Sequence, residues 1–69
     1  MIYSVQMTLK EFREKEFITG GITEVDGNEY YIDKCMGGKY FCGFIGQKQY
    51  TRATARMIQT AIIEDVLKK

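Results

Sequence analysis

The sequence predicts an α+β fold: a three- to four-stranded antiparallel sheet, arranged as a meander, with a short N-terminal helix and a long C-terminal helix packed on one face. Three observations predict it. Two turn signals divide a middle region rich in tyrosine, phenylalanine and isoleucine, a helix-capping motif lies near the start, and apolar residues recur with helical spacing near the end. Because 69 residues have room for one hydrophobic core, we expect a single domain over residues 1–69.

The N-terminal segment predicts a strand followed by a short helix. Residues 1–7 alternate apolar and polar side chains, a pattern typical of a half-buried strand. Thr8 and Glu11 then match a capping box, in which each side chain accepts a hydrogen bond from a free backbone N–H at the helix start. We expect this helix to end by Glu16.

Two glycine-containing turns predict three antiparallel strands. Asp26-Gly27 and Gly37-Gly38 suit turns whose residues need a positive φ angle. The strands that these turns separate cover Ile22–Val25, Tyr30–Cys35 and Lys39–Ile45.

The last segment, from about Thr51 to Lys69, has the period of a helix. Its apolar stripe consists of Ala55, Ile58, Ile62 and Val66. Thr51 is the predicted N-cap residue. We expect the stripe to cover one face of the sheet, because neither element can bury its apolar surface alone.

The composition argues against catalysis. The chain has no histidine, the side chain most often used in general acid–base mechanisms. Its two cysteines, Cys35 and Cys42, are too few for structural zinc, and we interpret them as structural thiols. We therefore expect no enzyme activity, no metal and no cofactor. Without a leader-like opening or an apolar run of membrane-spanning length, we expect a cytoplasmic protein that does not enter a membrane.

Charge is divided unevenly along the chain, although the net charge is only +1. Residues 1–33 hold three basic and seven acidic residues, whereas residues 34–69 hold seven basic and two acidic ones. The stretch from residue 34 to residue 56 contains five cations and no acid. An asymmetry of this kind favours a partner with a charged surface.

Four of these cations form a candidate anion site: Lys39, Lys48, Arg52 and Arg56. Arg52 and Arg56 are four residues apart, so we expect them on one side of the last helix with Arg52 in its first turn. Arginine beside outward-pointing backbone N–H groups suits a phosphate, a nucleic acid or a partner's carboxylate. The alternative is that these are ordinary solvated side chains whose stems cover apolar surface.

Strand aromatics and one methionine form a candidate protein interface: Tyr30, Tyr31, Tyr40 and Met57. Strand alternation directs about half of the rings away from the helix-covered face, where they can anchor a protein contact or stack on bases. The alternative is that the N-terminal strand and short helix cover them.

The order helix, three antiparallel strands, helix resembles that of double-stranded-RNA-binding domains. In that family a basic motif at the start of the second helix contacts phosphates, and the matching stretch here is Arg52-Ala-Thr-Ala-Arg56. The family's proline–histidine loop is replaced by the Asp26-Gly27 turn. The strands and last helix are also similar to the three-stranded arm-binding domains of tyrosine recombinases. Both resemblances lie in element order, and we assign the chain to neither family.

These observations favour a small non-catalytic binding protein. The first hypothesis is a protein-binding module, monomeric or homodimeric, of the kind that phages and mobile elements use as inhibitors or adaptors to block a larger nuclease or nucleic-acid-handling complex. The alternative is a small nucleic-acid-binding domain that contacts phosphates through the basic segment 34–56.

Overall fold

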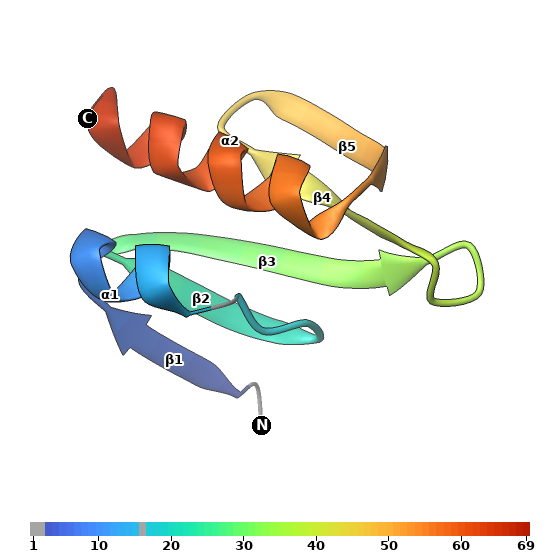
Figure 1. The fold of residues 1–69 in the computed structure, drawn as a ribbon, viewed down its shortest axis with the longest axis horizontal. Coiled ribbons are helices and arrows are strands. Elements are labelled where there is room, and N and C mark those ends of the chain that lie inside the picture. Colours follow the sequence, from blue (N-terminus) through green and yellow to red (C-terminus); the bar gives the residue numbers. More distant parts are fainter. Residues whose placement is uncertain (1–2, 16) are drawn as a thin grey trace.

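The computed structural model describes residues 3–15 and 17–69. In chain order these residues form β1 (Ser4–Met7), α1 (Leu9–Glu14), β2 (Gly21–Val25), β3 (Asn28–Cys35), β4 (Tyr40–Ile45), β5 (Lys48–Ala53) and α2 (Ala55–Leu67) (Figure 1). The first two residues of the predicted N-terminal strand, and the predicted helix end at Glu16, lie outside the described residues.

The strands form one five-stranded sheet whose spatial order, β1-β2-β3-β4-β5, repeats the order of the chain. The α+β class is confirmed, and β2 to β5 form the antiparallel meander. The sheet has one strand more than the largest number predicted. In addition, β1 pairs parallel to β2, with Ser4 beside Ile22 and Met7 beside Val25. A parallel pair needs a crossover connection, which residues 8–20 supply with α1.

Both predicted turns are confirmed. Asp26 and Gly27 join β2 to β3 with φ angles of 48° and 83°, so both turn residues adopt the left-handed conformation that the dipeptide favours. Between β3 and β4, residues 36–38 have φ angles of 54°, 71° and 84°. Glycine populates this conformation without the steric cost that a side chain imposes.

A third hairpin, which was not predicted from the sequence, joins β4 to β5. Ile45 pairs with Lys48 across the two-residue loop Gly46-Gln47, and Gly46 has a φ angle of 64°. A glycine between two runs with strand propensity is a hairpin signal of the same kind as the two predicted ones. The pairing with β4 stabilises residues 48–53 as a strand.

The predicted start of the last helix at Thr51 is therefore wrong. Thr51 lies within β5, and the N-cap residue of α2 is Thr54, whose hydroxyl accepts a hydrogen bond from the backbone N–H of Met57 at 3.2 Å. The buried alanine is Ala53 at the end of β5, whereas Ala55, predicted to begin the apolar stripe, is exposed. The helix was predicted to begin too early because the turn at Gly46, after which residues 48–53 form β5, was not recognised.

Both helices lie on the same face of the sheet (Figure 1). The core between helices and sheet consists of Phe12, Val25, Tyr30, Ile32, Ile45, Ala53, Ile58, Ile62 and Val66. Phe17, in the connection after α1, packs edge-to-face on Phe41 of β4 with ring centroids 5.2 Å apart. The rest of the α2 stripe, Ile58, Ile62 and Val66, is buried as predicted.

The predicted capping box at the start of α1 is confirmed. The Thr8 hydroxyl accepts from the Glu11 N–H at 3.2 Å, and the Glu11 carboxylate accepts from the Thr8 N–H at 2.9 Å. The hydrogen bond from the Thr8 N–H, followed by the contact with the Thr8 hydroxyl, lowers the pKa of the Glu11 carboxyl below its ordinary value. Gln59 of α2 donates to the Phe12 carbonyl oxygen at 3.3 Å, which ties the two helices together.

Over residues 3–15 and 17–69, neither helix has the length and apolar character that a bilayer crossing requires. The molecule is small, with a Cα radius of gyration of 11.1 Å.

Candidate binding surfaces

One face of the sheet carries both helices, and no segment among the described residues covers the other. We call this second surface the open sheet face. Strand register places on it the apolar and thiol residues Ile22, Tyr31, Cys35, Tyr40, Cys42 and Phe44 and the acidic residues Glu24, Glu29 and Asp33. Tyr31, Tyr40 and Phe44 are 49%, 36% and 61% exposed. The alternative that the N-terminal strand and helix cover the strand aromatics is wrong for these three rings, because β1 extends the sheet sideways and α1 packs on the opposite face.

Two of the acidic residues on the open sheet face are direct neighbours on adjacent strands. Glu24 of β2 lies directly opposite Glu29 of β3, and Asp33 lies farther along the same strand on the same face. Like charges directly opposite one another in a sheet are destabilising. A cationic group from a partner would relieve this repulsion.

Tyr30, one of the predicted interface residues, is only 4% exposed and belongs to the core. Its hydroxyl donates to the Asp65 carboxylate of α2 at 2.5 Å. Burial, followed by the contact with Asp65, raises the pKa of the Tyr30 hydroxyl above its ordinary value. Tyr30 is therefore unavailable to a partner, and it joins β3 to α2.

The two cysteines are diagonal neighbours on β3 and β4, where Cys35 lies opposite Tyr40 and Cys42 lies opposite Asp33, and both are half-buried free thiols. Cys35 donates to the Thr51 carbonyl oxygen, with 3.2 Å between Sγ and O, and Cys42 donates to the Asp33 carbonyl oxygen at 3.6 Å. The neighbouring Cys35 thiol, partial burial and the Asp33 charge raise the pKa of the Cys42 thiol. This environment favours the thiol over the nucleophilic thiolate.

A second candidate surface is the α2–β5 groove, a hollow of about 740 Å³ between the β4–β5 hairpin and one side of α2. Its middle is lined by Tyr50, Met57 and Ala61, with Thr60 beside them. Because α2 runs back along β5 after the turn at Thr54, the first residues of the helix line one end of the groove and residues 64–68 line the other.

Cations lie at both ends of the groove. Arg56 lines the end near the start of α2, whereas Lys48 and Lys68 line the hairpin end, where Lys48 lies over the Tyr50 ring at 5.1 Å from its centroid. Glu64 and Asp65 also line the hairpin end, but Asp65 accepts from the Tyr30 hydroxyl and pairs with Lys69 at 3.5 Å. Glu64 is the acidic residue of the groove that has no such contact among residues 3–15 and 17–69.

The predicted anion site does not converge on one point. Arg52 lies on β5 and not in the first turn of α2, so it does not share a helix side with Arg56. Lys48 begins β5, and a six-residue strand spans roughly 18 Å, which separates it from the start of α2. Lys39 lies in the turn before β4. These four cations have no ion-pair partner within the described part of the chain.

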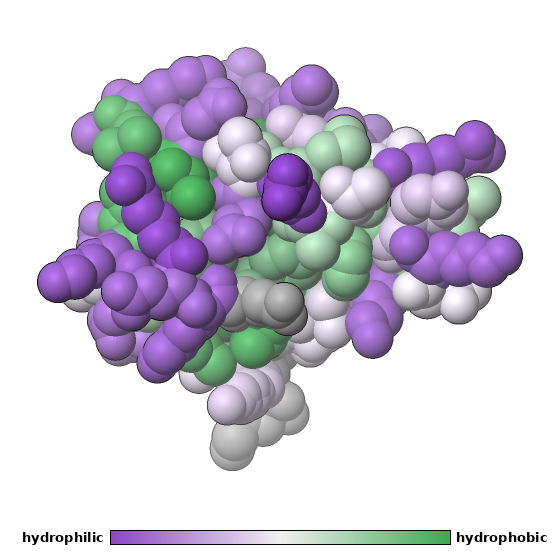
Figure 2. All heavy atoms as spheres, in the orientation of Figure 1, coloured by the Kyte–Doolittle hydropathy of each residue, from purple (hydrophilic) through white to green (hydrophobic). Residues whose placement is uncertain are grey.

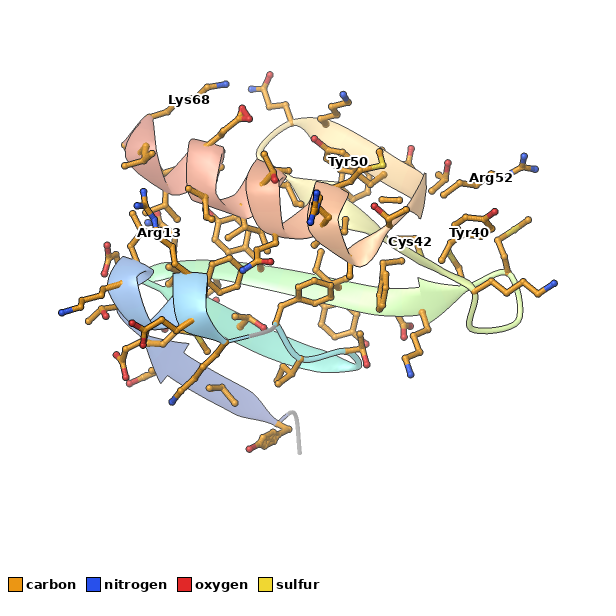
Figure 3. The ribbon with its side chains drawn as sticks, in the orientation of Figure 1. Arg13, Tyr40, Cys42, Tyr50, Arg52 and Lys68 are labelled. Carbon is orange, nitrogen blue, oxygen red and sulfur yellow. The ribbon has the colours of Figure 1, made fainter. Side chains whose placement is uncertain are left out.

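Figure 3 shows Arg52 and Tyr40 at one end of the sheet and Lys68 at the distant end of α2. Figure 2 shows hydrophilic side chains interrupting the hydrophobic surface on the face in view. The groove was not predicted, because Lys48 was placed in a loop and the helix was predicted to begin at Thr51, so that β5, which contributes Lys48 and Tyr50 to the lining, was absent from the predicted fold.

Comparisons with known proteins find no match to this chain among protein-family models, curated proteins or solved structures. The resemblance to double-stranded-RNA-binding domains also weakens at the structural level. The observed order has four antiparallel strands before the last helix, and a further strand, β1, pairs parallel to β2. Arg52, which the resemblance placed at the start of the second helix, belongs to a strand. The fold and surfaces define a small α+β domain with one uncovered sheet face and a groove beside its last helix.

Proposed function

We propose that this chain is a small non-catalytic binding protein that acts through protein–protein contacts on its open sheet face. The observation that carries the proposal is the group of exposed rings of Tyr31, Tyr40 and Phe44 on a sheet face that no described segment covers. Aromatic rings supply large contact area and dominate the binding energy of many interfaces.

The charges beside these rings favour a basic partner surface. Glu24 and Glu29 face each other on adjacent strands and gain most from a neighbouring cation. A basic groove that normally holds nucleic acid has this complementary charge. We therefore propose an inhibitor or adaptor, of the type found in phages and mobile elements, that occupies such a groove on a larger nucleic-acid-handling complex.

The proposal is tested by affinity capture with matched variants. In the open-face variant, Tyr31→Ser is combined with Phe44→Ser. In the control variant, Tyr3→Ser is combined with Leu67→Ser, which removes two apolar side chains that are each 62% exposed and lie outside both candidate surfaces. We expect a host protein captured by the wild type to be lost with the open-face variant and retained with the control. Equal capture by both variants, with both folded by circular dichroism, would contradict the proposal.

A second candidate function is nucleic-acid binding. It is favoured by one observation: Lys39, Lys48, Arg52 and Arg56 have no ion-pair partner within the described residues and remain available to phosphates. Their dispersion over a turn, a strand and a helix makes this the weaker candidate.

A further inference from the structure

The outer edge of β5 is free. β5 is the last strand of the sheet, with β4 as its neighbour on one side and no described strand on the other. In an antiparallel ladder alternate residues direct their backbone N–H and C=O groups away from the partner strand, so this edge presents hydrogen-bonding groups to an incoming chain. An extended peptide can add to such an edge as a further strand.

The α2–β5 groove lies on the helix-bearing side of this same strand. A peptide paired with β5 would direct every second side chain toward α2, because side chains alternate between the faces of a sheet. Residues i, i+2 and i+4 of an extended peptide span about 13 Å, which fits beside a six-residue strand. The groove therefore has the position and length to accept three alternate side chains.

The lining of the groove specifies the chemistry of those side chains. Its middle presents Tyr50, Met57 and Ala61 to an apolar group. Arg56 lines one end, and Lys48 and Lys68 line the other together with Glu64 and Asp65, of which Asp65 is already paired with Lys69. We propose that the groove binds an extended segment of a partner protein that adds to β5 as a sixth strand and carries the pattern acidic–x–apolar–x–acidic.

A second copy of this chain is a poor occupant of the same edge. Antiparallel pairing of two β5 strands about Tyr50 would place Lys48 of one copy opposite Arg52 of the other, at both ends of the pair. Like charges directly opposite are destabilising in a sheet. The cations that oppose self-pairing are complementary to an acidic peptide, so charge selects the peptide over the copy.

The test uses a displayed library of short random peptides, selected against the immobilised chain. We expect the enriched peptides to share the acidic–x–apolar–x–acidic pattern. Met57→Glu, which places an acid in the middle of the groove, is expected to weaken their binding by about tenfold or more, with Leu67→Glu as the matched control because Leu67 is on the same helix, exposed, and outside the groove. N-methylation of alternate peptide amides is expected to cause a similar loss, because it removes strand pairing.

Three outcomes would overturn the inference. They are enrichment of peptides without the pattern, equal losses in Met57→Glu and Leu67→Glu, and binding that stays unchanged in both peptides when each alternate set of amides is N-methylated in turn. A β5-mediated dimer in sedimentation experiments would overturn it as well. This inference rests on the proposed protein-binding role but concerns a different surface. We therefore expect the open-face variant Tyr31→Ser/Phe44→Ser to keep peptide binding. Loss of the proposed function at the open sheet face would leave peptide binding in the groove intact, so the two failures can be distinguished.

Discussion

At the scale of single residues, the hydrogen bond between Tyr30 and Asp65 links the central strand to the last helix. Tyr30→Phe keeps the ring and removes the hydroxyl, so we expect it to lower the free energy of unfolding by about 1.5–3 kcal/mol, the range for a hydrogen bond to a charged group. Urea unfolding measures the loss. Tyr31→Phe is the control, because its hydroxyl lies on the exposed open sheet face.

The same residue predicts a pH dependence. Because the folded state raises the pKa of Tyr30 above its ordinary value of 10, the folded protein retains a proton that the unfolded chain releases in this range. The stabilising contribution of Tyr30 is therefore fully present below pH 10 and declines as pH rises above it. We expect the stability difference between wild type and Tyr30→Phe to shrink above pH 10, and a constant difference would contradict this account.

The thiol pair gives a second prediction at this scale. Since the raised pKa of Cys42 keeps its sulfur protonated, we expect iodoacetamide to alkylate Cys42 more slowly at neutral pH than it alkylates an unstructured cysteine peptide. Mass spectrometry of a time course measures the rate. A rate above that of the peptide would contradict the structural role of the thiols and support a catalytic one.

At the scale of elements, the predicted and observed N-cap residues of α2 differ: the sequence pattern predicted Thr51, and the structure has Thr54. We expect Thr54→Ala to destabilise the protein by about 1 kcal/mol, the usual cost of losing an N-cap hydroxyl. Thr51→Ala removes the hydroxyl at the cap that the sequence predicted and is expected to cost less than about half of that amount, because Thr51 is exposed on a strand. Thermal unfolding of the two variants measures the difference, and the reverse order of stability would contradict the observed boundary.

Elements whose signals are local were predictable from the sequence. The Thr8–Glu11 box and the Asp26-Gly27 turn depend on side chains close in sequence, and both are present as predicted. β5 was not predictable in the same way, because its strand conformation depends on pairing with β4 and its residues also fit a helical period. The parallel pairing of β1 was missed because no local pattern specifies which strand lies beside it.

In the candidate surfaces, too, features with local signals were predictable and features that depend on distant elements were not. Strand alternation predicted that about half of the rings face away from the helices, without specifying which; Tyr31 and Tyr40 do so, whereas Tyr30 faces the helices and is buried. The grouping of Arg52 with Arg56 depended on a helix boundary, so it failed with that boundary. The groove requires both β5 and α2 in place, and sequence spacing alone contains no information about it.

At the scale of the whole molecule, the uneven charge of the sequence becomes a gradient across the sheet. Because the strand order repeats the chain order, the acidic first half lies on the β1 side and the basic segment lies on the β5 side. This separation favours partners with both a basic and an acidic region, each facing its opposite.

The dispersed cations also predict how nucleic acid would bind. Four converging cations would give a slope of log affinity against log salt near −3.6 on duplex DNA, whereas we expect a slope no steeper than about −2, because few of the four reach phosphates together. Fluorescence titration at several salt concentrations measures the slope. A value near −3.6 that Arg52→Glu/Arg56→Glu removes would favour the nucleic-acid function over the protein-binding one.

The identity of strand order and chain order has a consequence for how the molecule acquires its shape. From β2 onward each strand pairs with the one made immediately before it, across loops of two to four residues that close rapidly. Only the pairing of β1 with β2 must wait for closure of the longer segment 8–20. The meander with α2 can therefore collapse first, and the N-terminal strand joins a surface that has already formed.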